Sequence, residues 1–269
     1  MPKKWYFRLC FVWSLRNFVF VAVQNEIKSK FSNSKLGLAW TIINPLTQVL
    51  IYTTILSNVI SLKIPGMESR YAFAIYLVSG LLVWTLFTEI VTRLTSMFIE
   101  SGPYLKKVNF PKIRMPLTII TACLFNHILL FFCASVIVFI VGQGFDFSVF
   151  WLLPLAFITV LLAVGLGMLA SIFAVFVRDT VFAVPIILQI WFWLTPIVYP
   201  IEILPKSLQA IIIFNPLYPL VSGYQKILLT QETPSEIFPL LLIVTISILL
   251  QYACMNVFQR ARAEIMDSI

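Results

Sequence analysis

Six long apolar runs determine the fold class of this chain of 269 residues. A helix needs about 20 mostly apolar residues to cross roughly 30 Å of hydrocarbon, and each run supplies that length. The runs are continuously apolar, whereas the strands of a membrane barrel alternate. We therefore predict an all-α integral membrane protein, as expected at 60% hydrophobic and 11% charged residues. The six predicted transmembrane helices cover residues 36–60, 71–96, 116–141, 150–177, 181–199 and 237–258.

The basic residues predict the orientation of these helices. With the N-terminus in the cytoplasm, fifteen of the nineteen Lys and Arg residues fall on the cytoplasmic side. This asymmetry places both termini in the cytoplasm. The net charge of +8 then reflects contact with anionic lipid headgroups, so we expect membrane lipids and no nucleic acid as partners. We divide the chain into an interfacial helix at 1–35 and a six-span domain at 36–269.

Several catalytic motifs are missing from the sequence. It contains no G-x-x-x-x-G-K-[ST] phosphate loop, no H-E-x-x-H and no G-x-S-x-G. We therefore expect a chain that is not an enzyme and does not hydrolyse ATP by itself. The four cysteines lie in cytoplasmic or membrane positions, so neither a disulfide nor a metal site is expected. His127, beside Asn126 in the third span, fits a hydrogen-bonded packing residue better than a proton relay.

Polar residues recur at helical spacing within two of the apolar runs. In the second span, Glu89 and Arg93 are four residues apart, as in an ion pair on one helix face. Such a pair is either neutralised packing or part of a hydrated cavity. Thr85, Thr88, Thr92 and Ser96 share the spacing and favour a polar lumen. The first span shows a similar stripe of Thr41, Asn44, Gln48 and Tyr52, although each such residue also suits interhelical hydrogen bonding.

The residues between the fifth and sixth spans, 200–236, are apolar but broken by prolines. Two short helices are predicted, Ser207 to Phe214 and Leu217 to Leu229, and neither is long enough to cross the bilayer. We interpret them as re-entrant helices that form an external gate. The alternative is an amphipathic hairpin on the outer membrane surface.

Two other segments have simpler interpretations. The cytoplasmic residues 100–115 hold a possible short helix, Tyr104 to Asn109, which either docks a partner or only supplies basic residues. In the fourth span, Ala163, Gly167 and Ser171 are four residues apart, with Gly165 nearby. Small residues at this spacing allow close helix approach, so we assign this span to packing.

Four short motifs occur in order along the chain: "NFPKIRMPL", "FVRDT", "WLTPIVYP" and "FNPLYPLVSGYQ". Together they resemble polysaccharide-export ABC transporter permeases. The segment "NFPKIRMPL" is similar to the family's segment after its cytoplasmic coupling helix, and "FVRDT" to its turn before the fifth span. "WLTPIVYP" and "FNPLYPLVSGYQ" look like its gate region. The approach to the first span also matches, through Lys30, Ser34, Leu36, Gly37, Trp40, Pro45 and Leu46.

The resemblance implies a homodimeric permease in the bacterial inner membrane. It would work with two copies of a separate ABC ATPase subunit, which binds the ATP and Mg, and would export a lipid-linked glycan such as O-antigen, capsule or teichoic acid. Aromatic faces in the path would support sugar rings. The path candidates are Gln48, Tyr52, Trp84, Phe87, Glu89, Arg93, Trp191, Trp193 and Tyr199. The ATPase-coupling candidates are Tyr104, Leu105, Lys106, Lys107, Val108 and Asn109, and those for the gate are Phe214, Asn215, Pro216, Tyr218 and Pro219.

Two rival functions remain open at this point. An ABC-type exporter of a drug or small lipid would share the six spans and the separate ATPase, but with fewer aromatic residues in its lumen. A membrane glycosyl or lipid transferase fits less well, because the eleven acidic residues form no D-x-D or D-D-x-x-D cluster.

Overall fold

Among the residues that the structure describes, four helices are long and apolar enough to cross a membrane: Ala72–Glu100, Met115–Val136, Phe147–Phe176 and Ile237–Arg260. They match four of the six predicted spans. The computed structural model describes residues 21, 24–25, 36, 39–51, 72–107, 114–140, 144, 146–234 and 237–268. These ranges contain helices and no strand, which agrees with the predicted all-α class.

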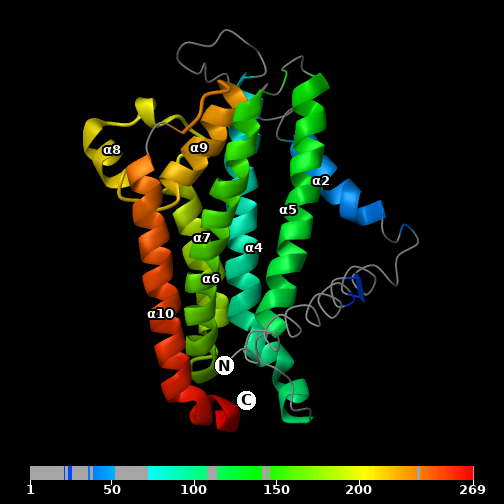
Figure 1. The fold of residues 1–269 in the computed structure, drawn as a ribbon, viewed down its shortest axis with the longest axis vertical. Coiled ribbons are helices and arrows are strands. Elements are labelled where there is room, and N and C mark those ends of the chain that lie inside the picture. Colours follow the sequence, from blue (N-terminus) through cyan, green and yellow to red (C-terminus); the bar gives the residue numbers. More distant parts are fainter. Residues whose placement is uncertain are drawn as a thin grey trace, which may run out of the picture.

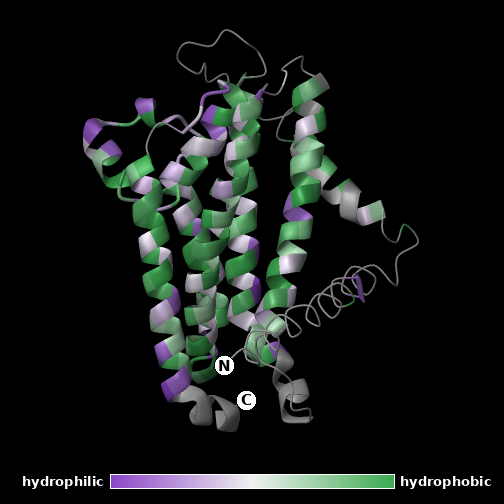
Figure 2. Cartoon of the chain, in the orientation of Figure 1, coloured by the Kyte–Doolittle hydropathy of each residue, from purple (hydrophilic) through white to green (hydrophobic). Residues whose placement is uncertain are grey.

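The long helices stand side by side and alternate in direction (Figure 1). The α-helices are α2 (Trp40–Ile51), α4 (Ala72–Lys107), α5 (Arg114–Ile140), α6 (Leu152–Phe176), α7 (Thr180–Trp193), α8 (Lys206–Ile212), α9 (Tyr218–Leu229) and α10 (Ile237–Ser268). Two short 3-10 helices, η3 (Phe147–Trp151) and η4 (Ile201–Ile203), precede α6 and α8. Hydrophobic residues cover most of the bundle, and hydrophilic residues gather on α8 and near the C-terminal end of α10 (Figure 2).

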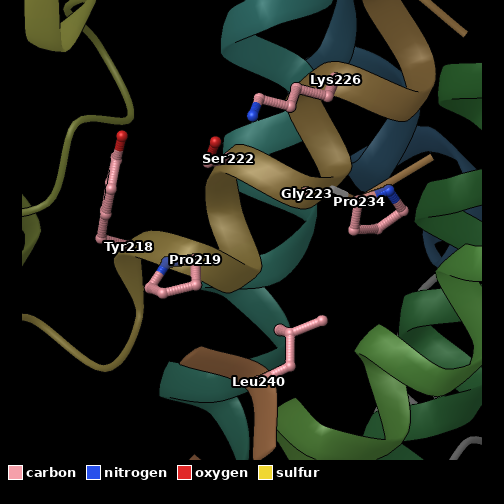
Figure 3. A pocket seen from close by; sticks show the side chains of 7 residues that line it. All are labelled: Tyr218, Pro219, Ser222, Gly223, Lys226, Pro234 and Leu240. Atoms are coloured by element: carbon pink, nitrogen blue, oxygen red, sulfur yellow. The ribbon is translucent and has the colours of Figure 1, made fainter. Parts of the chain in front are cut away.

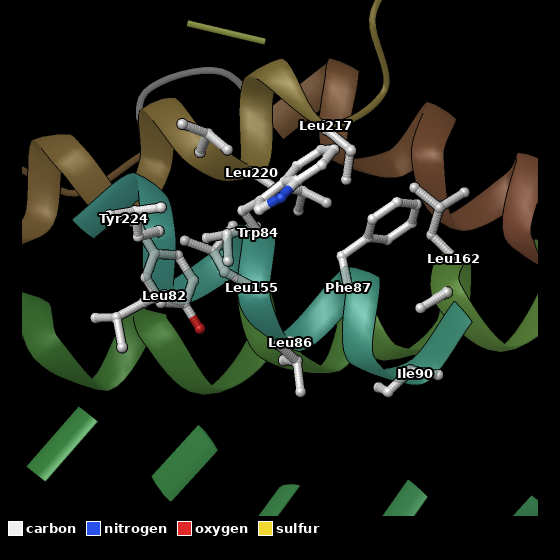
Figure 4. Close-up of a cluster of buried hydrophobic side chains, with 14 of the residues drawn as sticks. Leu82, Trp84, Leu86, Phe87, Ile90, Leu155, Leu162, Leu217, Leu220 and Tyr224 are labelled. Carbon is white, nitrogen blue, oxygen red and sulfur yellow. The ribbon is translucent and has the colours of Figure 1, made fainter. Parts of the chain in front are cut away.

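Helix α4 occupies the centre of the bundle. Its apolar stretch is 83% buried within the protein, against 22–33% for the other three long helices. It packs against α5, α6, α7 and α9, and Figure 4 shows its Leu82, Phe87 and Ile90 in the resulting core. Because the outer helices leave most of their apolar surface open, lipid is the solvent that suits them.

Small residues bring α6 close to its neighbours, as predicted. A Cβ atom at Gly167 would lie 2.9 Å from the Leu94 Cβ of α4, and one at Gly165 would lie 2.9 Å from the Leu250 Cβ of α10. Ala163 and Ser171 are fully buried. The close approach of α6 to both α4 and α10 therefore depends on the missing side chains.

Helix α7 is shorter than the predicted fifth span, 181–199. We expected it to continue to Tyr199, but α7 ends at Trp193 and residues 194–200 form turns and bends. Pro196 has no backbone N–H and disfavours helical geometry at the preceding Thr195, which explains the break. At 1.5 Å per residue, the 14 residues of α7 span about 21 Å, less than the roughly 30 Å of a bilayer core.

The other predicted boundaries have mixed outcomes. α4 continues to Lys107, so Tyr104 to Lys107 form its last turn and not a separate short helix. The two short helices after the fifth span are present as α8 and α9, close to their predicted positions. The first predicted span is described only at Leu36 and at 39–51, where α2 lies, and most of residues 1–35 fall outside the described ranges. A six-span count therefore stays a prediction.

Candidate functional site

A polar stripe runs along α4 between Ala72 and Phe98. From Ala72 to Phe98, every residue is buried except six partly exposed ones, and all six are polar. They are Thr85, Thr88, Glu89, Thr92, Arg93 and Ser96. The residues whose spacing predicted a lumen face are therefore the same residues that remain partly exposed between Ala72 and Phe98.

The threonine hydroxyl groups of the stripe point back to their own helix. Thr85, Thr88 and Thr92 donate to the carbonyl oxygens four residues earlier, at 2.8, 2.8 and 2.7 Å. The hydroxyl protons are thus used within the helix, while each oxygen still has a lone pair with which to accept a hydrogen bond. This part of the stripe can accept hydrogen bonds from water or a sugar hydroxyl without offering a strong donor.

The charged part of the stripe is joined to α5. Glu89 Oε1 accepts a hydrogen bond of 2.7 Å from Asn126 Nδ2 and lies 3.5 Å from the Arg93 guanidinium. The side chains of Arg93 and Glu89 remain 29% and 30% exposed. The guanidinium also lies 3.8 Å from the Cys123 sulfur. The predicted ion pair is therefore confirmed, and it lies at an open edge of the α4–α5 interface.

Asn126 was missed as a site residue in the sequence analysis. Its signal was an amide within an otherwise apolar run, beside His127. His127 itself lies 3.5 Å from the Tyr224 hydroxyl of α9 and packs edge-on against its ring. This contact agrees with the interpretation of His127 as a packing residue.

The aromatic path candidates divide into a packed group and an exposed group. Phe87 is fully buried and Trp84 is 9% exposed; Phe87 contacts Trp191 edge-on at 5.5 Å between ring centroids, and Trp84 contacts Phe192 at 5.4 Å. In this arrangement neither Trp84 nor Phe87 reaches an open surface.

Trp193, by contrast, is 60% exposed at the end of α7. The Tyr199 hydroxyl donates to the Trp193 carbonyl oxygen at 2.7 Å, so the two residues close the turn that follows α7. The side chain of Gln48 and the whole of Tyr52 lie outside the described residues. Contact of any of these residues with substrate stays a prediction.

Three side chains hold the broken segment that follows α7. The Tyr76 hydroxyl of α4 lies 3.1 Å from the Pro196 carbonyl oxygen and 3.0 Å from that of Tyr199. The Gln225 amide of α9 also donates to the Pro196 carbonyl, at 3.2 Å. Gly80 makes room for this contact, because a Cβ there would lie 3.1 Å from the Gln225 amide nitrogen. Two carbonyl groups of the non-helical segment that follows α7 are thus satisfied by side chains of α4 and α9.

The third side chain is Asn215, in the connection between α8 and α9. Its Oδ1 accepts from the Trp191 indole N–H at 3.0 Å and from the Leu217 backbone N–H at 3.0 Å. Its Nδ2 donates to the Leu194 carbonyl at 3.3 Å and to Thr195 Oγ1 at 2.9 Å. The neighbouring Phe214 is 88% exposed. Of the predicted gate residues, Asn215 therefore has the most extensive bonding.

A small pocket lies beside α9, where the chain approaches α10 (Figure 3). Its polar lining comes from Tyr218, Ser222 and Lys226, which are spaced four residues apart on α9. Its apolar lining comes from Pro219, Gly223, Pro234 and Leu240. Two of the predicted gate residues, Tyr218 and Pro219, thus belong to this pocket. Within the described ranges, no three His, Cys, Asp or Glu side chains gather closely enough to hold a metal ion.

The coupling candidates are described only in part. The backbone of Tyr104 to Lys107 is helical, but their side chains, and all of Val108 and Asn109, lie outside the described residues. Their proposed role in contacting an ATPase stays a prediction.

Comparison with known proteins matches most of the chain to one family model, described as ABC-2 type transporter, over residues 17–229. The O-antigen export system permease protein RfbA of Myxococcus xanthus is 27% identical over 260 residues, covering 96% of this chain and 97% of the relative. A protein of the same name from Klebsiella pneumoniae is 27% identical over 76% of this chain and 77% of its own length. The polysialic acid transport protein KpsM of Escherichia coli is 25% identical over 71% and 73%.

Proposed function

Since the chain belongs to the ABC-2 type transporter family, we propose that it is the membrane permease of a polysaccharide exporter. The observation that carries the proposal is the similarity, over almost the full length of both chains, to a protein named as an O-antigen export permease. A relative named for polysialic acid transport supports the same class of cargo. The substrate of this chain is then a lipid-linked glycan, which moves out of the cytoplasm.

The polar stripe of α4 supports a path for such a cargo. Charged side chains in a membrane avoid lipid and face protein or water-filled cavities. Glu89 and Arg93 are about 30% exposed within one chain, so a second copy of the chain is the natural partner to enclose them. We propose a homodimer in which the stripes of the two copies border the path. Threonine oxygens then accept hydrogen bonds from passing sugars without holding them tightly.

A separate ATPase supplies the energy in this proposal. The sequence has no phosphate-binding loop, so ATP and Mg bind to the partner. The ends of the helices support a docking side: the last turn of α4, the first turn of α5, the turn between α6 and α7 and the C-terminal end of α10 lie at the same end of the bundle (Figure 1). Basic residues mark each of them, namely Lys107, Arg114, Arg178 and Arg260. We assign this end to the cytoplasm of a bacterium, at its inner membrane.

Deletion of the chain in the organism that encodes it tests this function. We expect surface glycan to fall and lipid-linked glycan to accumulate inside the cell, with rescue by the wild-type chain but not by a variant truncated within α4. A drug or small-lipid exporter is the alternative. Normal surface glycan together with new sensitivity to an apolar drug would refute the polysaccharide proposal and favour that alternative.

The assignment of ATP hydrolysis to a partner has its own test. The purified chain in lipid nanodiscs should hydrolyse no ATP above the background of empty nanodiscs. Hydrolysis by the chain alone, in a preparation free of contaminating ATPase, would contradict the assignment.

A further inference from the structure

Helix α8 has little apolar burial to hold it in place. Ile212 is its only buried residue, and Ile211 and Phe214 are largely exposed. Figure 1 shows α8 standing out from the end of the bundle. Something other than core packing must therefore fix the position of this helix.

Asn215 lies in the connection that follows α8, and its amide group is fully used. An asparagine side chain has two donor hydrogens and two acceptor lone pairs. Here both lone pairs accept, from Trp191 and Leu217, and both hydrogens donate, to Leu194 and Thr195. Three of these four bonds reach the end of α7. The amide thus joins the start of α9 to the end of α7, directly beside the exposed α8.

The attachment also reaches the centre of the bundle through Trp191. The indole that donates to Asn215 packs edge-on against Phe87, which is buried in α4. Phe87 lies next to Thr88 and Glu89 of the polar stripe. If α8 moves and the indole hydrogen bond breaks, the Trp191 ring loses a restraint on its orientation. That ring contacts α4, the helix that carries the polar stripe.

We propose that Asn215 is a positioning residue that links α7 to the α8–α9 pair, so that the end of α7 and the pair move as one unit during export. The role of Asn215 in export rests on the proposed function. The link that Asn215 makes between α7 and the α8–α9 pair does not. It assigns no contact between Asn215 and the cargo. The residue acts by fixing the orientation of Trp191 and the place of α8.

Hydrogen exchange of the purified chain in lipid nanodiscs tests the link without any transport. We expect backbone amides of 206–214 to exchange about tenfold faster in Asn215→Leu, because three hydrogen bonds to α7 are lost together. Trp191→Phe keeps a ring against Phe87 but removes the N–H, and about threefold faster exchange is expected. In the Asn215→Leu background, Trp191→Phe should add nothing further. Ser207→Ala, at an exposed position of α8, is the matched control and should leave exchange unchanged.

Surface glycan in complemented cells, at equal amounts of chain in the membrane, tests the role in export. Asn215→Leu and Trp191→Phe should each reduce it severalfold, whereas Ser207→Ala should not. Unchanged exchange in both variants would overturn the proposed link. Faster exchange with normal export would overturn the positioning role. If the wild-type chain itself exports no glycan, the proposed function fails, and the exchange experiment still decides the link.

Discussion

Replacing Asn126 by leucine should weaken the junction between α4 and α5. Glu89 has a hydrogen bond of 2.7 Å from Asn126 and a longer contact of 3.5 Å with Arg93. The variant removes the hydrogen bond and keeps the longer contact. A hydrogen bond to a charged group contributes about 1.5–3 kcal/mol to stability. For a domain of this size, each kcal/mol shifts the melting temperature by about 2–4 °C. The expected decrease is therefore roughly 3–12 °C.

The assay is thermal denaturation of the purified chain in a fixed detergent, followed by the fraction that remains monodisperse. Phe132→Leu, at a side chain of α5 that is 65% exposed, is the matched control and should change the melting temperature little. Glu89→Gln should lower the melting temperature less than Asn126→Leu, because a glutamine oxygen can still accept the hydrogen bond from Asn126. The variant loses only the charge on that hydrogen bond and a partly exposed ion pair at 3.5 Å, which contributes about 0.2–1 kcal/mol.

The double variant Asn126→Leu/Glu89→Gln makes the reasoning refutable. Its loss should be smaller than the sum of the two single losses, since both variants act on one contact. Additive losses, or an Asn126→Leu variant as stable as the Phe132→Leu control, would refute the assignment of Asn126 as the partner that holds Glu89.

Three further outcomes are expected. Gly167→Ala should lower the free energy of unfolding by about 1–3 kcal/mol, because its Cβ would lie 2.9 Å from that of Leu94. Gly144→Ala is the control and should leave stability unchanged, because a Cβ there would have no atom within 4 Å. Equal effects of the two variants would contradict close packing as the cause. Replacing residues 104–107 with Gly-Ser residues should leave membrane insertion intact but uncouple the partner's ATP hydrolysis from export. Unaltered export would show that another segment does the coupling. Trp193→Ala should reduce export of a long glycan more than flipping of its bare lipid carrier, and equal reductions would favour a small-lipid cargo.

The α4 stripe was predictable because it depends on spacing along one helix. Positions 85, 88, 89, 92, 93 and 96 share a face whatever surrounds them. The role of Asn126 was not predictable, because nothing in the sequence specifies which face of α5 meets Glu89. Likewise, the burial of Trp84 and Phe87 depends on their packing against Phe192 and Trp191 of α7. Aromatic residues in an apolar run look alike whether they line a path or fill a core.

The end of α7 shows a second kind of limit. The apolar run continues through Trp193 to Tyr199, so hydropathy alone extended the helix too far. Pro196 marked the break, but prolines are tolerated in membrane helices when other groups satisfy the freed carbonyls. The decisive groups, Tyr76 and Gln225, come from other helices. Their pairing with Pro196 is a property of the tertiary structure.

The arrangement of the Glu89 contacts has a consequence for how the chain enters the membrane. Arg93 is on the same helix as Glu89, one turn away, and is therefore present as soon as α4 is made. Asn126 arrives later, with α5. While α4 leaves the insertion machinery, the arginine alone offsets the carboxylate, which reduces the cost of placing a charge in hydrocarbon. The order of synthesis thus separates the two contacts: the ion pair lowers the cost of inserting the helix, and the amide joins the helix to its neighbour afterwards.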